Sequence, residues 1–308
     1  MVEILVGAGG WDYFNVPRDR LRSYAKAFRT VEVNSTYYRI PPLSLVGSWR
    51  KRVPDAFEFT VRCNRELMIR LRRETLDSSL EVFDRMKQIC LVLRANILHV
   101  QIPSTYGLEK ESIEKIEEFL SAASLGGMRL AWEIRVPSGE RRINLLNMLN
   151  AHDVVHAVDL SKEEPAYESD IIYSRLFGKG FHNVYQFTDA ELEEIDRKVK
   201  GSGAKKAYLN FHGIRMYKDA ARISIYETSG NFPRVTRGVG VDSVLEVLQE
   251  DALFPAHTSE LVRSQGWKVV EWKDNEQLRL SDLFRKIEER RFENLSEVKA
   301  VLQKLQPF

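Results

Sequence analysis

The chain alternates between short apolar, β-branched runs and longer segments whose apolar residues recur every three or four positions. The first pattern predicts buried strands and the second predicts amphipathic helices. Regular alternation of the two is typical of a parallel α/β sheet. The predicted strands are 3–7, 30–34, 57–62, 96–101, 129–134, 153–158, 171–176 and 205–211.

Helical patterns lie between most of these strands, at residues 18–28, 78–93, 111–123 and 189–199. This repetition predicts a closed (β/α)8 TIM-type barrel. The alternative is an open doubly wound sheet, which usually carries a glycine-rich phosphate turn after its first strand. Here Gly7-Ala8-Gly9-Gly10 leads into Trp11 without the G-x-G-x-x-G spacing, so the barrel is favoured.

The pattern changes after Arg237-Gly238-Val239-Gly240. We therefore predict two domains, a barrel over residues 1–237 and a small α-rich accessory module over residues 238–308. In the module we expect a hairpin that turns at Asp274-Asn275. Its predicted helices are 242–250, 259–265, 282–290 and 297–305.

Several predicted strands carry charged or amide residues at their ends, although strands of a parallel sheet are normally apolar throughout. Side chains alternate along a strand, so Glu32 and Asn34 share one face, as do Glu133 and Arg135. Burying such groups costs free energy unless they gather at one polar site. In a barrel that site lies at the carboxyl ends of the strands.

Four of these residues are candidates for catalysis. Glu32 and Glu133 occupy matching strand positions and would act as a base or as ligands of a divalent metal ion. Asp159 ends the sixth strand, and His212 follows the eighth. The alternative for both glutamates is a buried ion pair with an arginine of the barrel.

A second group of residues is expected to bind the substrate. Arginines at three strand ends favour an anionic ligand, and the alternative is that they neutralise the carboxylates. Aromatic residues near the same ends would stack on a ring of the ligand or cap the core. The predicted binding residues are Trp11, Asn34, Tyr37, Arg62, Gln101, Arg135 and Arg175.

The strand motifs resemble those of the YecE-like family, domain-of-unknown-function family 72. The resemblance covers roughly residues 1–225 and is carried by 6–11, 31–38, 57–62, 100–104, 131–135 and 173–178. It implies a TIM-type barrel and no settled reaction. Three positions depart from the family pattern: Arg62 replaces a lysine, Phe177 replaces a histidine, and Phe211-His212-Gly213 replaces a Phe-Asn-Asn run.

Composition and the first residues favour a soluble protein over a membrane-spanning or secreted one. The 308 residues are 44% hydrophobic with a net charge of +2, and no apolar run is long enough to cross a membrane. The first residues enter a strand directly and do not resemble a signal peptide. Cys63 and Cys90 are expected to be buried thiols. These features predict a soluble cytoplasmic protein.

The net charge hides a basic segment, because residues 50–73 hold eight Lys and Arg residues against three Asp and Glu residues. Its part after the third strand includes Arg65, Arg70, Arg72 and Arg73, which would attract phosphates or form a solvated helix face. We therefore predict a hydrolase acting on a phosphate-bearing ligand, as a nuclease or phosphodiesterase. The alternatives are a sugar or sugar-phosphate enzyme, or a non-catalytic adaptor whose C-terminal module binds protein or nucleic acid.

Overall fold

The computed structural model describes residues 2–17, 19–274 and 276–304. The chain divides into two compact units. The first contains Met1–Leu176 and Asp196–His212, and the second contains Phe177–Ile195 and Gly213–Phe308. The separate module predicted for residues 238–308 stays a prediction.

The first unit contains all eight predicted strands, with ends that differ from the predicted ones by two residues or fewer. They are β1 (Glu3–Ala8), β2 (Thr30–Val33), β3 (Glu58–Arg62), β4 (Ile97–Ile102), β5 (Arg129–Ile134), β6 (Val155–Ala157), β7 (Ile171–Leu176) and β8 (Lys206–Phe211). These strands form two parallel sheets, one in the order β2-β3-β4-β5-β6 and one in the order β1-β8-β7. The fold is therefore α/β with parallel sheets, as the alternating pattern predicted.

The two sheets approach each other at both of their edges. Between β6 and β7, Val158 pairs with Ser174 in a parallel bridge, and the Arg175 amide donates to the Val158 carbonyl at 2.9 Å. Between β1 and β2, the Tyr24 hydroxyl accepts from the Ala8 amide and donates to the Thr30 carbonyl, at 2.8 Å each. A phenol therefore links the backbones of the two strands at this edge.

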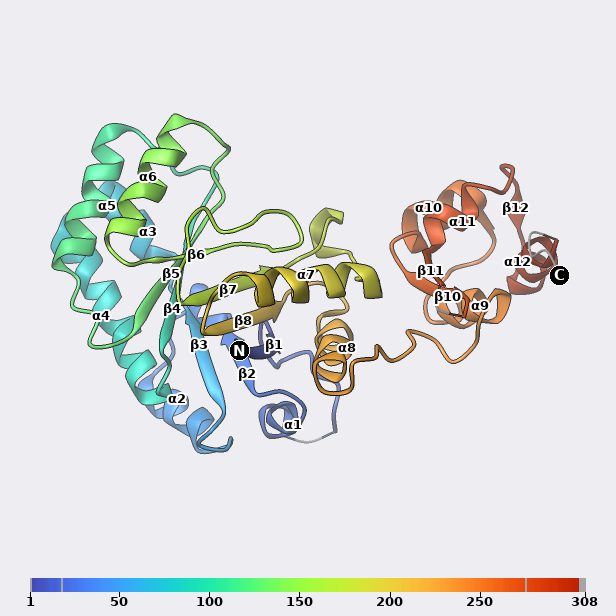
Figure 1. Cartoon of the computed structure of the whole chain (residues 1–308), viewed down its shortest axis with the longest axis horizontal. Coiled ribbons are helices and arrows are strands. Elements are labelled where there is room, and N and C mark those ends of the chain that lie inside the picture. Colours follow the sequence, from blue (N-terminus) through green and yellow to red (C-terminus); the bar gives the residue numbers. More distant parts are fainter. Residues whose placement is uncertain (1, 18, 275, 305–308) are drawn as a thin grey trace. The chain divides into compact units, whose positions relative to one another are not determined.

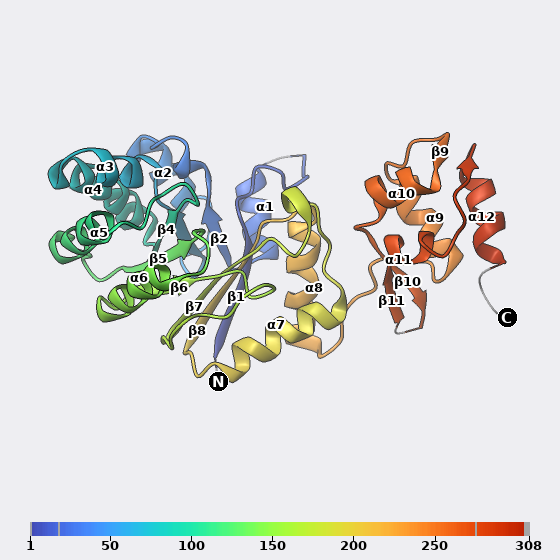
Figure 2. The ribbon, with the colours of Figure 1, turned by 90° about the horizontal axis from the view of Figure 1, so that it is seen from above.

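Helices lie between the strands and along the outer side of the five-stranded sheet (Figures 1 and 2). α4 packs against β3 and β4, and α6 packs against β6. The helices of this unit are α1 (Arg20–Ala27), α2 (Leu43–Arg50), α3 (Glu66–Arg73), α4 (Leu76–Leu93), α5 (Lys110–Ala122) and α6 (Glu140–Ala151), with the 3-10 turn η1 (Ser35–Tyr37).

Sequence signals explain where these helices begin. At α1, the Asp19 carboxylate accepts from the Arg22 amide at 3.2 Å, and at α4 the Thr75 hydroxyl accepts from the Ser78 amide at 3.3 Å. The predicted helix 18–28 matches α1, although Arg18 lies outside the described residues. In the part of the chain that the structure describes, no helix is both long and apolar enough to cross a bilayer.

The inward faces of the strands divide into an apolar layer and a polar layer. Leu5, Ile97, Ala131, Val155, Ala157, Tyr173 and Tyr208 pack together as a buried cluster. Two residues beyond Tyr173 and Tyr208, towards the carboxyl ends of β7 and β8, the same faces carry Arg175 and Asn210. Both are buried, as are Glu32 of β2 and Arg62 of β3. The apolar layer therefore supports a polar layer at the carboxyl ends.

The second unit has its own apolar core, which includes Val244, Leu261, Leu283 and Phe292. The predicted hairpin is confirmed as an antiparallel pair, β10 (Val269–Lys273) with β11 (Glu276–Arg279), although Asn275 lies outside the described residues. The other elements are η2 (Phe181–Asn183), α7 (Asp189–Gly201, shared with the first unit), α8 (Met216–Ser229), α9 (Val241–Gln249), β9 (Ala256–His257), α10 (Thr258–Gln265), α11 (Leu280–Phe284), β12 (Arg291–Phe292) and α12 (Leu295–Gln303).

The prediction of one helix in this part of the chain is wrong. The predicted helix 282–290 ends at Phe284, because the chain then turns and extends so that Arg291 and Phe292 pair with β9. The predicted helix 297–305 corresponds to α12, which begins earlier because Asn294 caps it by accepting from the Ser296 and Glu297 amides. Leu305 lies outside the described residues.

Gly7 should be indispensable, because a Cβ atom built on it would lie 2.2 Å from the Thr30 carbonyl oxygen of β2. We expect Gly7→Ala to destabilise the protein by about 2 kcal/mol or more, since a backbone atom would have to move. The matched control is Gly47→Ala in α2, where the nearest atom would be 3.9 Å away. This control should stabilise the helix by about 0.5–1 kcal/mol. Urea denaturation checks both, and equal stabilities would contradict the close approach of β1 and β2.

Candidate functional site

A buried arginine joins two carboxylates in the polar layer. Arg175 of β7 donates to Glu32 of β2 through Nε and Nη2, both at 3.0 Å, and to Glu133 of β5 through Nη1 at 2.6 Å. Arg175 is 1% exposed and Glu32 is fully buried. The predicted convergence of Glu32, Glu133 and Arg175 is therefore observed, in the form of the ion pair that the sequence left as an alternative.

Tyr173 and Thr60 extend this network towards the apolar layer. The Tyr173 hydroxyl donates to Glu32 Oε2 at 2.7 Å and lies 2.9 Å from the Thr60 hydroxyl. His99 stacks on the Tyr173 ring, and its Nε2 lies 3.3 Å from Glu133 Oε2. Tyr173 was not among the predicted site residues, although its parity with Arg175 on the same strand places it on the inward face.

The network keeps both carboxylates charged. Burial alone would raise the pKa of Glu32, but the charge of Arg175 outweighs it, with smaller contributions from His212 and His99, and holds that pKa well below its usual range. Burial also opposes ionisation of Glu133, whose pKa is lowered by Arg175, His99 and Arg135. The two carboxylates raise the pKa of Arg175 against the effect of burial. All three groups are therefore ionised at neutral pH.

Glu32 and Glu133 were predicted as ligands of a divalent metal ion, and the observed geometry does not fit such an ion between them. Each of the four carboxylate oxygens already accepts a hydrogen bond, from Arg175, Tyr173 or Arg135. The Arg175 guanidinium already contacts both carboxylates, and it would repel a second cation placed between them. Within the described residues, no group of three or more His, Cys, Asp or Glu side chains could hold a metal ion.

Arg62 is the second buried arginine of this layer, and its environment differs from that of Arg175. It donates to Asn34 Oδ1 at 2.7 Å and to Gln101 Oε1 at 2.6 Å, and its guanidinium lies 3.7 Å from the centre of the Tyr37 ring. Arg62 Nε has no hydrogen-bond partner, and Arg62 forms no ion pair with any residue that the structure describes. Burial, followed by repulsion from Arg175, lowers the pKa of Arg62.

Two polar residues of β8 and its end complete the layer. His212 Nε2 lies 3.3 Å from Glu32 Oε1, and the imidazole occupies the space beside Gly9, where an added Cβ would lie 2.2 Å from the ring. Asn210 pairs in register with Gly7 on one side and Arg175 on the other. It is fully buried, and neither polar atom of its side chain has a partner among the described residues.

The other predicted site residues have local contacts. Asp159 accepts from the Ser161 amide and hydroxyl and lies 3.2 Å from Lys162 Nζ, so it stabilises the turn after β6. Trp11 packs edge-on against Trp49. Arg135 is exposed and donates to Glu133 at 2.6 Å. Of these three, Arg135 joins the network through Glu133.

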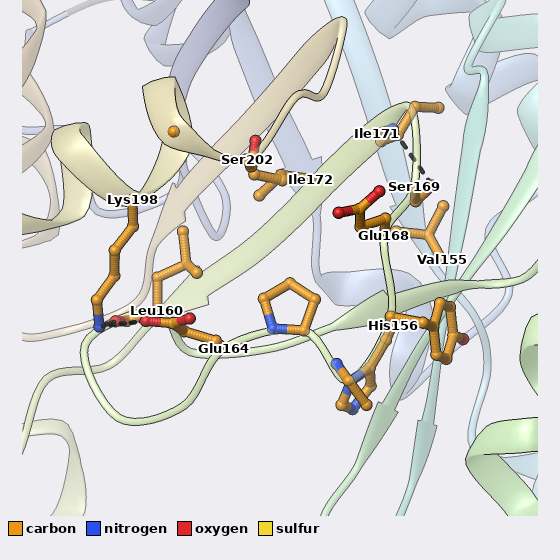
Figure 3. A pocket seen from close by; sticks show the side chains of 14 residues that line it. Val155, His156, Leu160, Glu164, Glu168, Ser169, Ile171, Ile172, Lys198 and Ser202 are labelled. Carbon is orange, nitrogen blue, oxygen red and sulfur yellow. Dashed lines mark hydrogen bonds and ion pairs between the residues drawn. The ribbon is translucent and has the colours of Figure 1, made fainter.

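A separate cavity of about 460 Å³ lies next to the long connection between β6 and β7, which contains no helix (Figure 3). His156 lines it, and its Nδ1 accepts from the Ala166 amide at 3.0 Å. Lys198 donates to the Leu160 carbonyl at 3.1 Å (Figure 3). None of the predicted site residues lines this cavity.

The fold and the buried charges define an α/β protein of parallel strands with a polar site at their carboxyl ends. Residues 6–224 match the family model described as "Protein of unknown function DUF72". The chain therefore belongs to the DUF72 family, and the resemblance seen in its strand motifs is confirmed.

Comparisons with individual proteins agree with this assignment. The chain is 29% identical over 122 residues to UPF0759 protein YunF of Bacillus subtilis (strain 168), over 36% of this chain and 43% of that protein. It thus spans less than half of that curated relative. Crystal structures of DUF72 family proteins from Thermotoga maritima and Enterococcus faecalis share its fold, with TM-scores of 0.60 and 0.57 and identities of 19% and 18%. Each covers 74% of this chain, and the matches span 100% and 98% of those structures.

The ion network predicts strong coupling between Arg175 and Glu32. Arg175→Gln should lower the free energy of unfolding by about 3–5 kcal/mol, because it leaves two buried carboxylates without their cation. Glu32→Gln should also destabilise the protein. The double variant should recover part of this loss, since Glu32 and Arg175 are removed together. A double-mutant cycle from urea denaturation measures the coupling, and additive effects would show that the pair does not interact.

Buried neutral histidines predict that acid destabilises the fold. Burial lowers the pKa of His99 and His156 to about 4 and that of His212 to about 3, with repulsion from Arg175 or Arg142 adding to it. The unfolded chain takes up these protons near pH 6.5, whereas the folded protein does not. Stability is therefore complete above that pH and is lost as the pH falls towards 4, by up to about 1.4 kcal/mol per pH unit for each histidine.

Thermal melts from pH 7 to pH 4 check this expectation. His156→Gln should flatten the acid limb of the melting-temperature curve. His182→Asn, which removes an exposed histidine, is the control and should leave the limb unchanged. Parallel curves for wild type and His156→Gln would show that His156 is not buried in its neutral form.

Proposed function

We propose that this chain binds a phosphate-bearing ligand at the carboxyl ends of its strands and hydrolyses a phosphoester bond there. The observation that carries the proposal is Arg62, which is 7% exposed and is held by two neutral amide oxygens. A buried cation without a carboxylate partner is costly. A bound anion would offset that cost, and a planar guanidinium suits the oxygens of a phosphate group.

The rest of the layer leaves this positive charge uncompensated. Glu32 and Glu133 are matched by Arg175 and Arg135. His99 and His212 are neutral at pH 7, because burial lowers the pKa of each. The formal charge of the cluster therefore equals that of Arg62. Asn210 adds a buried amide that has unused hydrogen-bonding capacity.

For the hydrolytic step, His212 is the group that fits the role of general base. It lies beside the Glu32 carboxylate, which would stabilise the imidazolium after proton uptake. A bound phosphate would bring further negative charge to the site and raise the pKa of His212 towards neutrality. The imidazole would then accept a proton from the water that attacks phosphorus, the P–O bond to the leaving group would break, and the imidazolium would return the proton to the departing alkoxide.

The alternatives draw less support from the contacts. For a sugar enzyme, the aromatic residues predicted to stack on the ring were Trp11 and Tyr37, but Trp11 packs on Trp49 and the Tyr37 ring lies under Arg62. A non-catalytic adaptor would bind the ligand without turnover.

We also propose that the two parallel sheets form one closed barrel, as the repeat pattern predicted. The bridge at Val158 and the Tyr24 link between β1 and β2 support this closure. A closed barrel would gather the eight carboxyl ends around one mouth. A crystal structure in which β1 and β2 are separated by solvent would contradict it.

Arg62 and His212 should have separable effects. Arg62→Gln should weaken binding of thymidine monophosphate by about 1.5–3 kcal/mol, the range for hydrogen bonds to charged groups, and Arg62→Lys should weaken it less. The control is Arg129→Gln at the opposite end of β5, where the arginine pairs with Asp153 and Asp170. Isothermal titration calorimetry measures binding, and equal affinity in wild type and Arg62→Gln would reject the anion site.

Hydrolysis is tested separately with bis(p-nitrophenyl) phosphate. His212→Gln should abolish turnover while leaving the affinity for thymidine monophosphate close to that of wild type. Binding without turnover by the wild-type protein would favour the adaptor alternative.

A further inference from the structure

A basic cavity adjoins Arg62 at the carboxyl ends of β3 and β4. It measures about 310 Å³, and two of its lining residues, Tyr37 and Gln101, also contact Arg62. Arg65, Arg72 and Arg73 supply its positive charge. The cavity therefore borders the site proposed above.

The three arginines lie along one side of α3, because positions i, i+7 and i+8 fall on the same helix face. Arg65 comes directly before the helix, and its amide donates to the Tyr37 carbonyl at 3.1 Å, which holds the start of α3 against η1. At 1.5 Å per residue, the stripe from Arg65 to Arg73 extends for about 12 Å.

These arginines lack acidic partners. No ion pair joins any of them to the residues that the structure describes. Arg72 donates a 3.0 Å hydrogen bond from Nη1 to the Thr105 carbonyl, and its guanidinium lies 5.8 Å from the centre of the Tyr106 ring. Arg70 on the same helix behaves differently, because it lies 3.3 Å from Glu81 and 3.9 Å from Glu74. Like charges that lack acidic partners on one wall attract an anionic ligand.

A buried hydroxyl in the same cavity distinguishes it from a solvated basic helix face. Tyr106 lines the cavity and is 3% exposed, and its hydroxyl has no hydrogen-bond partner among the described residues. A buried hydroxyl without a partner costs free energy, which a ligand oxygen would offset. The cavity thus offers both charge and a specific hydrogen bond.

We infer that this cavity binds further phosphate groups of the same ligand, and that the ligand is single-stranded nucleic acid. This inference rests on the anion site proposed at Arg62. The stripe of arginines is longer than the spacing between the two phosphates of a diphosphate, so it suits successive phosphates of a chain. Tyr38, which is 66% exposed and lies beside Tyr37, provides an aromatic face on which a base can stack.

The test compares an eight-nucleotide oligothymidylate with thymidine monophosphate. The cavity variant is Arg65→Ala with Arg73→Ala. The control is Arg70→Ala with Arg85→Ala, which removes the same charge from α3 and α4 at positions that do not line the cavity. Binding is measured by fluorescence anisotropy over a range of salt concentrations, and thermal melts verify that both variants are folded. If the double-alanine variant has a lower melting temperature than the wild type, the variant Arg65→Gln with Arg73→Gln replaces it in the binding experiment.

The wild-type protein should bind the oligonucleotide more tightly than the mononucleotide. The slope of log K against log salt should fall by about 1.4 in the cavity variant, because each contact with a single-strand phosphate contributes about 0.7. The control variant should keep the wild-type slope. Both variants should keep the wild-type affinity for thymidine monophosphate, which binds through Arg62.

Equal slopes in the cavity variant and wild type, or equal losses in the cavity and control variants, would overturn the inference. So would tighter binding of duplex than of single strand. If thymidine monophosphate binds through Arg62 but the oligonucleotide binds no tighter, this inference fails and the proposed function stands. If thymidine monophosphate does not bind or does not depend on Arg62, the proposed function fails.

Discussion

The contact of one guanidinium with two carboxylates determines the arrangement of the polar layer. Arg175 on β7 contacts Glu32 on β2 and Glu133 on β5, strands that are not neighbours in either sheet. Taking three charges out of water costs several kcal/mol for each ion, and close hydrogen bonds between them are required to offset this cost. The register of these strands therefore has to be held within a narrow range, and the apolar cluster that includes Leu5, Ile97 and Tyr208 supplies that support.

Because Arg175 contacts both glutamates, neither carboxylate is left to neutralise Arg62, and the proposed site carries a net positive charge. Arg175 is occupied by the two glutamates, and Arg135 adds a further cation beside Glu133. Arg62 lies in the same layer but reaches amide oxygens, so no acidic contact matches its charge among the described residues. Arg65, Arg72 and Arg73 line the basic cavity of about 310 Å³. Tyr37 and Gln101, which contact Arg62, line the same cavity. A structural ion pair and a candidate binding surface are thus adjacent and distinct.

Most of the fold could be predicted because its signals are local. The eight strands were each marked by an apolar run, and the inward positions followed from alternation, which placed Glu32 with Asn34 and Glu133 with Arg135. The helix predicted over 78–93 is also observed, as α4, which begins two residues earlier because Thr75 caps it. The predicted helix 282–290 was wrong beyond Phe284, because the chain leaves the helix there and Arg291 and Phe292 then pair with Ala256–His257. Pairing with a distant segment leaves no periodic signal in the sequence.

The sequence by itself determined which residues face inward at the strand ends and that those ends are rich in arginine and carboxylate. Only the tertiary structure decided which arginine meets which carboxylate. That choice gave Arg175 a structural role and left Arg62 in contact with amide oxygens. It also placed the Asp159 carboxylate in contact with Ser161 of the turn after β6. The Asn210 side chain was left without a partner among the described residues. The physical reason is that pairing across the interior depends on the register of non-neighbouring strands and on side-chain reach. Neither is encoded in the spacing of residues along one strand.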